Sequence, residues 1–293
     1  MIRQFHDNSV DPPVRGFLHI PESASGIALV LTHGAGSNAQ APLLVALAET
    51  FCAAGFTVLR CDLPYRQVRS FGPPGPGDAA RDRAGLKNAV NAVKQELDAP
   101  RLAAVARRGI PDAIAPFKPG SGLSGDVQNT AVAPPLSRSL RQGGDFPKGW
   151  GSIFLAGHSY GGRQSSMLCA ELAENNHAGA PLLADVARRG DFQIQRALIA
   201  GLLLLSYPLH PPRKPEQQRT QHLPNLRTPT LFVSGTRDPF GSIAELEQAL
   251  KMIPAKTKLL AIEGAGHDLG FKGKAKKQEL PQSIFSEFAS SFG

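Results

Sequence analysis

The residues of this sequence best suited to chemistry are a serine, an aspartate and a histidine, each placed just after a short apolar segment. Ser159 stands in Gly-His-Ser-Tyr-Gly, Asp238 in Gly-Thr-Arg-Asp-Pro and His267 in Gly-Ala-Gly-His-Asp. A serine hydroxyl is a weak nucleophile at neutral pH, so it needs a histidine that takes its proton and an acid that orients this histidine. These residue types in this chain order indicate acyl transfer to water through an acyl-serine intermediate.

The choice of acid and base has alternatives. Asp268 is a second candidate acid, but it directly follows His267, which makes the geometry between carboxylate and imidazole awkward. An aspartate that precedes a proline, such as Asp238, can be only a turn former, and His267 can be an ordinary loop histidine. Their joint position after successive predicted strands favours Asp238 and His267.

Glycines surround Ser159 where a predicted strand gives way to a predicted helix. A reversal this sharp leaves little room for Cβ atoms two residues before and after the serine, which are Gly157 and Gly161. The turn lifts the hydroxyl above the sheet and aims the N-terminus of the following helix at it. The pattern therefore predicts a nucleophile elbow, with a merely structural glycine turn as the alternative.

A second glycine-rich loop, Leu-Thr-His-Gly-Ala-Gly at 31–36, follows the first buried strand. Its glycines let backbone amides face the serine, so the N–H groups of Ala35 and Tyr160 are predicted to form an oxyanion hole. A simple glycine turn is the alternative. His33 in this loop is interpreted as structural.

The elements that must position these residues follow an α/β pattern. Short apolar segments predict strands that are buried on both faces, and helix-like segments lie between or after them. This alternation predicts a mostly parallel, doubly wound sheet with helices on both faces. Together with the chain order of Ser159, Asp238 and His267, it predicts an α/β-hydrolase fold. The predicted strands are 27–32, 56–60, 152–157, 201–207, 230–235 and 258–264, and residues 14–21 are expected to add an antiparallel edge strand. The predicted helices are 41–54, 78–97, 162–175, 242–252 and 280–291.

We expect a single domain over residues 1–293, interrupted by an insertion at 99–149 that forms a cap or lid. The insertion is rich in turn and breaker residues. A second proline-dense segment, 207–229, is expected to arch over the carboxyl edge of the sheet. It carries His210 and Arg219, which could bind a substrate carboxylate, although solvated loop charges are the alternative.

Composition limits the partners of this chain. The formal net charge is +8, but lysine and arginine are scattered and the densest basic run, 271–279, has no interleaved aromatic residues, so we expect no nucleic-acid partner. No apolar run approaches the roughly 20 residues needed to cross a bilayer, and no signal peptide is evident, which predicts a cytoplasmic protein. No dinucleotide, phosphate-loop or metal-ligand pattern is present, so we expect no cofactor and no metal. The expected partner is a small acyl substrate, and the oligomeric state is open.

Five motifs together resemble a known family. His-Gly-Ala-Gly, GHSYGGR, LLLLSYPLHPP, GTRDPFG and GAGHDL look like the dienelactone-hydrolase-related branch of the α/β-hydrolases, over residues 26–98 and 150–290. This branch includes testis-expressed hydrolase-like proteins and a subunit of the NSL chromatin complex. The resemblance implies Ser159, Asp238 and His267 as the triad. Esters, thioesters and short peptides are all possible substrates, and a simple carboxylic ester is the default expectation. Because some relatives are scaffold proteins, a non-catalytic interaction protein is the alternative.

Overall fold

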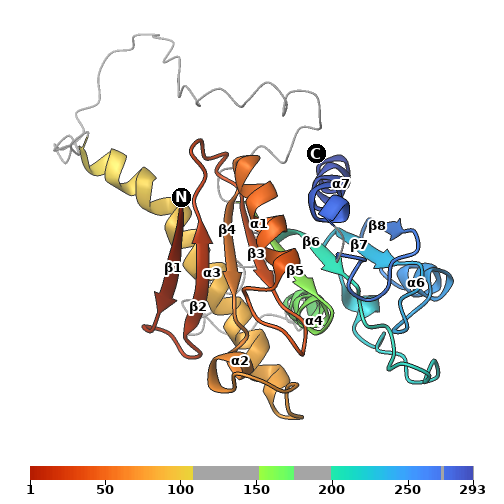
Figure 1. Cartoon of the computed structure of the whole chain (residues 1–293). Helices are drawn as coiled ribbons and strands as arrows, with labels where there is room; N and C mark the ends of the chain where they lie inside the picture. The colour runs from red at the N-terminus through yellow and green to blue at the C-terminus, as the bar shows by residue number, and fades with distance from the viewer. Residues whose placement is uncertain (108–151, 175–198, 272–273, 293) are drawn as a thin grey trace, which may run out of the picture.

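The computed structural model describes residues 1–107, 152–174, 199–271 and 274–292, and within them a single eight-stranded sheet (Figure 1). The strands lie in the order β1-β2-β4-β3-β5-β6-β7-β8. Their bounds are β1 Ile2–Asp7, β2 Val14–His19, β3 Ala28–Thr32, β4 Thr57–Cys61, β5 Ile153–His158, β6 Ile199–Leu205, β7 Thr230–Gly235 and β8 Thr257–Ile262.

The sheet is mostly parallel, as predicted. Strand β2 runs antiparallel to both β1 and β4, and every pair from β4 to β8 is parallel. The prediction that residues 14–21 form the edge strand is wrong, because β1 lies outside β2. Strand β1 was not predicted because its sequence is largely polar and only one of its side chains, Phe5, is buried.

Helices cover both faces of the sheet. Their bounds are α1 Pro42–Ala53, α2 Pro64–Val68, α3 Asp78–Arg107, α4 Tyr160–Glu174, α6 Ile243–Leu250 and α7 Lys274–Phe292, with a short 3₁₀ helix, η3, at Leu223–Asn225. Helix α3 is longer than predicted and includes residues 99–107 of the expected insertion. Strong helix formers such as leucine, alanine and arginine continue the helix through these residues. The rest of the expected insertion, 108–149, lies outside the described residues.

Two hydrophobic cores sandwich the sheet. Alternate residues of β3 contribute to different cores. Ala28 and Val30 belong to the core under α3, α4 and α6, whereas Leu29 and Leu31 belong to the core under α1 and α7. Burying one such leucine completely stabilises the fold by about 1.5–3 kcal/mol. Strand β8 was predicted to be buried on both faces, but its side chains are partly exposed because it forms the other edge of the sheet.

The topology brings the predicted reactive residues to one edge of the sheet. From β3 the chain crosses through α1 to β4 on one face, and from β4 it returns through α3 to β5 on the other face (Figure 1). Strands β3 and β5 are neighbours, so the loops that follow them meet at the point where the winding reverses, which is where open α/β sheets bind ligands. Among the described helices, none combines the length and apolar character that a membrane span requires.

Candidate active site

Ser159 occupies a strained turn between β5 and α4. Its backbone φ is 50°, in the left-handed region that residues other than glycine rarely adopt. Two hydrogen bonds hold this conformation: Ser159 N–H donates to the Leu205 carbonyl over 2.7 Å, and Arg163 N–H donates to the Ser159 carbonyl over 3.0 Å. The strain is thus supported from the neighbouring strand β6 and from the first turn of α4.

The glycines of this turn are required by close backbone packing. A Cβ atom on Gly157 would lie 2.4 Å from the Gly162 nitrogen, and one on Gly161 would lie 2.5 Å from the His33 carbonyl oxygen. These contacts involve backbone atoms, which cannot move aside cheaply. The sharp strand-to-helix reversal predicted for a nucleophile elbow is therefore present in the structure.

We expect Gly161→Ala to lower the free energy of unfolding by at least about 2 kcal/mol, because the new methyl group would overlap the His33 carbonyl. Gly77→Ala is the matched control, since a Cβ there meets nothing within 4 Å, and its effect should stay within about 0.5 kcal/mol. Urea unfolding of both variants measures the difference. Equal stabilities for the two variants would contradict the packing described for the turn.

The structure brings the three predicted triad residues into one hydrogen-bonded chain. Ser159 Oγ lies 2.8 Å from His267 Nε2. On the other side of the ring, His267 Nδ1 lies 2.9 Å from Asp238 Oδ2 and 3.0 Å from Oδ1. The Asp238 side chain is 1% exposed and that of His267 is 24% exposed, so the acid is enclosed while the base can be reached from solvent.

The surroundings of Asp238 fix the orientation of the histidine. Phe240 N–H donates to Asp238 Oδ1 over 2.9 Å, and the Phe240 ring lies against the His267 ring at 4.2 Å between centroids. Asp268, the alternative acid, accepts a hydrogen bond from Gly270 N–H over 3.0 Å and so holds the turn after His267. The geometry therefore favours Asp238 as the partner of the imidazole.

The peptide that carries the Ala35 N–H is held from its opposite side. The Gly34 carbonyl accepts from Ser37 N–H over 3.1 Å and from His33 Nδ1–H over 2.9 Å. In a planar trans peptide the carbonyl and the following N–H point in opposite directions, so anchoring the Gly34 oxygen aims the Ala35 N–H away from it. Tyr160 begins α4, where the first N–H groups have no partner within the helix.

His33 is structural, as interpreted from the sequence. It is fully buried, and its Nε2 accepts from Leu63 N–H over 3.1 Å while its Nδ1 serves the Gly34 carbonyl. These two bonds define a neutral ring, and burial lowers its pKa from the ordinary value. The imidazole thus braces the loop and takes no part in proton transfer.

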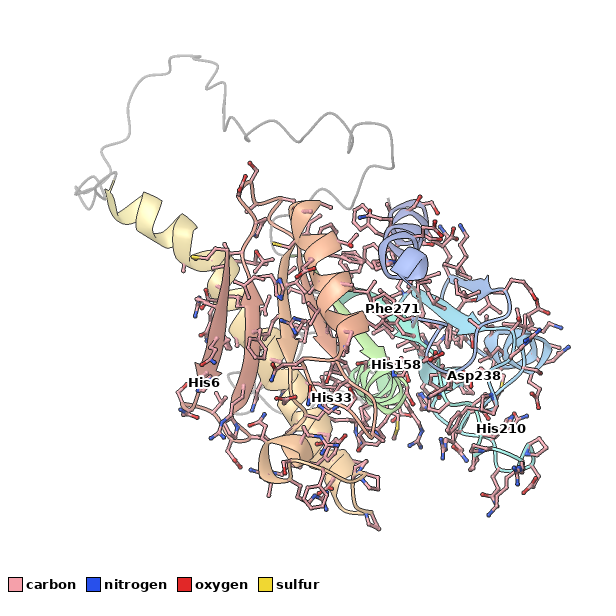
Figure 2. All side chains as sticks on the ribbon, viewed as in Figure 1. His6, His33, His158, His210, Asp238 and Phe271 are labelled. Carbon is pink, nitrogen blue, oxygen red and sulfur yellow. The ribbon has the colours of Figure 1, made fainter. Side chains whose placement is uncertain are left out.

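His158 is a site residue that the sequence reasoning missed. The side chain of His158 is labelled in Figure 2. Its Nε2–H donates to the His267 carbonyl oxygen over 2.9 Å, and the centroids of the two rings lie 5.3 Å apart. The residue before the nucleophile therefore holds the backbone of the catalytic base. Its position next to Ser159 was the one available signal, because nothing in the local pattern says where its side chain points.

His158 should make the protein less stable in acid. Burial, the largest cause, lowers its pKa from 6.5 to about 4, with His267, Asp238 and Asp268 as the facing charges. The His158 ring is therefore protonated near pH 6.5 in the unfolded chain, but only near pH 4 in the folded chain. The neutral His158 ring therefore contributes to the free energy of unfolding in full above pH 6.5. This contribution is lost as the pH falls from 6.5 toward 4, by up to about 1.4 kcal/mol per pH unit.

Urea unfolding at pH 7, 6 and 5 tests this expectation. His158→Gln keeps a donor near the His267 carbonyl but has no titratable ring, so the fall in unfolding free energy between pH 6 and 5 should be shallower by up to about 1.4 kcal/mol than in the wild type. Identical pH profiles for the two proteins would contradict the assignment.

The two residues predicted to bind substrate are placed differently. His210 is 5% exposed, its Nδ1 donates to the Pro211 carbonyl over 2.8 Å, and its Nε2 lies 3.5 Å from Glu245 in α6. Its backbone N–H donates to the carbonyl of Phe240 over 3.0 Å, so His210 lies near Asp238 (Figure 2), but its ring is occupied by these buried contacts. Arg219 is half-buried, and burial lowers its pKa first, followed by the nearby Arg163. Arg163 lies in the first turn of α4, four residues after Ser159, so Arg219 has a link to the elbow through Arg163.

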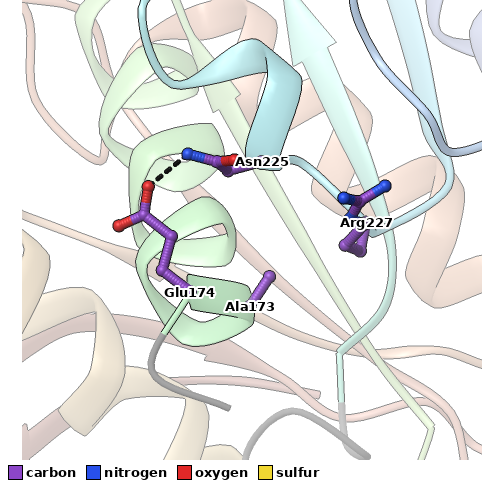
Figure 3. A pocket seen from close by; sticks show the side chains of 4 residues that line it. All are labelled: Ala173, Glu174, Asn225 and Arg227. Carbon is purple, nitrogen blue, oxygen red and sulfur yellow. Dashed lines mark hydrogen bonds between the residues drawn. The ribbon is translucent and has the colours of Figure 1, made fainter. Parts of the chain in front are cut away.

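A pocket of about 240 Å³ lies at the other end of α4. Ala173 and Glu174 line it together with Asn225 and Arg227 from the segment around η3, and Glu174 accepts a hydrogen bond from the Asn225 amide (Figure 3). At 1.5 Å rise per residue, this end is roughly 20 Å along the helix from Ser159. The pocket is therefore distinct from the triad.

Strand order, the antiparallel β2 and the elbow between β5 and α4 define the α/β-hydrolase fold. The alpha/beta hydrolase domain model matches residues 146–291. Among curated proteins, polyketide synthase ThaQ of Burkholderia thailandensis is 52% identical over 48 residues, a segment that makes up 16% of this chain and 2% of that protein.

Solved structures share the whole fold at low identity. An α/β serine hydrolase homologue from Coxiella burnetii has a TM-score of 0.58 at 13% identity, covering 98% of this chain and 97% of that one. Dienelactone hydrolase from Anabaena variabilis has a TM-score of 0.55 at 18% identity with the same coverage. Est1E from Butyrivibrio proteoclasticus has a TM-score of 0.50 at 14% identity, covering 98% of this chain and 97% of that one.

Proposed function

We propose that this protein is a serine hydrolase that cleaves a carboxylic ester, or a related acyl substrate, through an acyl-serine intermediate. The observation that carries the proposal is the unbroken chain of hydrogen bonds from Ser159 through His267 to Asp238. A scaffold protein has no need of a strained serine, a base within 2.8 Å of it and a buried acid behind that base. The arrangement therefore favours catalysis over the interaction-protein alternative.

In the first half-reaction, His267 Nε2 removes the Ser159 hydroxyl proton as Oγ attacks the substrate carbonyl carbon. The Asp238 carboxylate accepts from Nδ1–H, which fixes the tautomer and stabilises the imidazolium that forms. Negative charge develops on the substrate oxygen, and the N–H groups of Ala35 and Tyr160 are proposed to receive it. His267 then gives its proton to the departing alkoxide, which leaves the acyl-serine.

In the second half-reaction, water repeats these steps. His267 takes a proton from the water molecule as the water oxygen attacks the acyl carbon, and when the bond between this carbon and Ser159 Oγ breaks, His267 returns the proton to Oγ. The products are a carboxylic acid and free Ser159. The 24% exposure of the His267 side chain gives water access to the base. The same residues thus serve both halves, so the reaction needs no further group on the protein.

The finer parts of the proposal concern substrate and setting. Arg219, with Arg163 nearby, is the candidate for recognising an acidic group on the substrate, whereas the buried contacts of His210 leave it a structural role. We further propose a small acyl substrate, a cytoplasmic setting and membership of the dienelactone-hydrolase-related branch. Dienelactone hydrolase is the name of one structural neighbour, and another was solved with ferulic acid bound.

A panel of p-nitrophenyl esters with acyl chains from acetate to decanoate tests the proposed reaction. Release of p-nitrophenol that saturates with substrate concentration supports the hydrolase, and the chain length with the highest kcat/KM identifies the preferred acyl group. Protein heated until it unfolds is the control for release by surface side chains. Turnover equal to that control, on every ester, would overturn the ester-hydrolase proposal.

A further inference from the structure

We propose that Asp82 is a positioning residue that holds both halves of the oxyanion hole through two tyrosines. The inference rests on the proposed hydrolase function. Asp82 is completely buried and lies in α3, a helix that carries none of the triad residues. Its two carboxylate oxygens accept hydrogen bonds from two different elements, and each of these elements leads to one of the proposed oxyanion donors.

The first connection runs to the nucleophile elbow. The Tyr160 hydroxyl donates to Asp82 Oδ2 over 2.7 Å. Tyr160 directly follows Ser159, and its backbone N–H is one of the two proposed donors. Since the side chain is tied to α3, the start of α4 cannot rotate without breaking this bond. Asp82 therefore restrains the direction in which the Tyr160 N–H points.

The second connection runs to the loop that carries Ala35. Tyr65 N–H, at the start of α2, donates to Asp82 Oδ1 over 3.0 Å. The Tyr65 hydroxyl in turn donates to the Ala35 carbonyl over 2.8 Å and lies 3.3 Å from the Gly34 carbonyl. The Gly34 carbonyl belongs to the peptide that carries the Ala35 N–H, and the Ala35 carbonyl belongs to the next peptide, so the Tyr65 hydroxyl contacts the peptides on both sides of Ala35. Asp82 in turn holds the Tyr65 backbone.

Packing between the helices keeps this network closed. The Tyr65 and Tyr160 rings meet edge to face at 5.8 Å between centroids. Helix α2 lies beside the start of α3 (Figure 1). The two helices approach closely at Gly85, where a Cβ atom would lie 2.5 Å from Pro64 Cγ, and this approach brings the Tyr65 N–H within reach of Asp82. One turn of α3 therefore supplies both the acceptor and the space that its partner needs.

The choice of an aspartate at this point has a physical reason. Each carboxylate oxygen can accept without offering a donor, so one side chain satisfies a hydroxyl and a backbone N–H at once. Asp82 makes no ion pair within the described parts of the chain, and an unpaired buried carboxylate is costly to keep. Burial accordingly raises the pKa of Asp82 above its ordinary value, while the bonds from Tyr160 and Tyr65 oppose that rise. A buried carboxylate that lowers the stability of the fold in this way is consistent with a positioning role for Asp82 at the active site.

Asp82→Asn and Tyr160→Phe test the proposal in the full-length protein. An asparagine can accept both bonds only through its one oxygen, and a phenylalanine removes the hydroxyl but keeps the ring. On the best p-nitrophenyl ester we expect kcat to fall about 10-fold to 100-fold in each variant, less than the loss of a whole oxyanion donor, with KM within about 2-fold of the wild type.

The inhibition constant (Ki) of a trifluoromethyl ketone would stay unchanged if Asp82 served only the stability of the fold. The ketone forms a tetrahedral adduct with the serine, and its oxygen occupies the oxyanion position, so its Ki should rise in each variant by the same factor as kcat/KM falls. Phe51→Leu is the control: Phe51 is a buried residue of α1 in the core on the opposite face of the sheet from α3, and its variant should lose stability while keeping the Ki of the wild type.

The outcomes separate this inference from the proposed function. Wild-type Ki and kcat in both Asp82→Asn and Tyr160→Phe would overturn the role of Asp82 and leave the hydrolase intact. If Asp82→Asn does not fold, the Ki and kcat of Tyr160→Phe alone test the role of Asp82. This second substitution removes only the hydroxyl oxygen that donates to Asp82 and is expected to leave the fold intact. A wild-type protein that neither hydrolyses esters nor binds the ketone would overturn the proposed function, and the role of Asp82 with it.

Discussion

Replacing Ser159 with alanine is expected to lower kcat by about 10⁴-fold to 10⁶-fold on any ester that the wild type cleaves. The hydroxyl oxygen is the only atom removed, and it is the atom that His267 Nε2 approaches within 2.8 Å. Without it no acyl-serine can form, and what remains is the slow attack of water at a site that still binds substrate. The loss should appear in kcat, with a much smaller change in KM.

A matched control shows that such a loss is specific. Ser25 is also a hydrogen-bonded serine, whose hydroxyl donates to the Gly55 carbonyl over 2.8 Å, and it precedes β3 at the opposite end of that strand from the reactive loops. Ser25→Ala should therefore keep wild-type kcat. A folded Ser159→Ala protein with kcat within 10-fold of the wild type would show that another residue performs the chemistry.

Asp238→Asn is expected to have the next largest effect, a fall in kcat of about 10⁴-fold. The Asp238 carboxylate accepts the Nδ1–H of His267, and this bond leaves Nε2 free to take the serine proton. An asparagine can turn its NH₂ group toward Nδ1, which places the ring proton on Nε2 and blocks the base. The 1% exposure of the Asp238 side chain means that water cannot replace the lost charge.

Asp268→Asn separates the two candidate acids. Asp268 Oδ1 accepts from Gly270 N–H, so asparagine can preserve this bond, and kcat should change by less than about 10-fold. Steady-state kinetics of the two variants on the same ester give the comparison. If Asp268→Asn proved the more damaging substitution, the orienting acid would have to be reassigned.

The sequence predicts most of the framework of this fold because its strands carry strong local signals. Strands β3 to β7 are apolar on both faces, and the chain alternates them with helices, which is the pattern of a doubly wound sheet. Ser159, Asp238 and His267 could be selected because each follows such a strand, and parallel strands bring their carboxyl ends to a common edge. Chain order alone then predicts which side chains the structure brings together.

Features that depend on tertiary contacts escaped prediction. Strand β1 has a polar sequence and becomes a strand by pairing with β2, and α2 is too short to show a helical period. The roles of His158 and Asp82 depend on contacts with residues 109 and 78 positions away in the chain, which no local pattern encodes. His210 was a candidate for binding a substrate carboxylate or an exposed loop residue, and neither pattern predicted its burial beside α6.

The central claim, that Ser159 is an activated nucleophile, is tested most directly by labelling with a fluorophosphonate and mapping the adduct by peptide mass spectrometry. The probe phosphonylates a serine only when a base activates its hydroxyl, so surface serines stay unmodified. The account predicts one adduct per chain, on the peptide that contains Ser159, and none in Ser159→Ala. An unlabelled wild-type protein, or an adduct on any other residue, would contradict it.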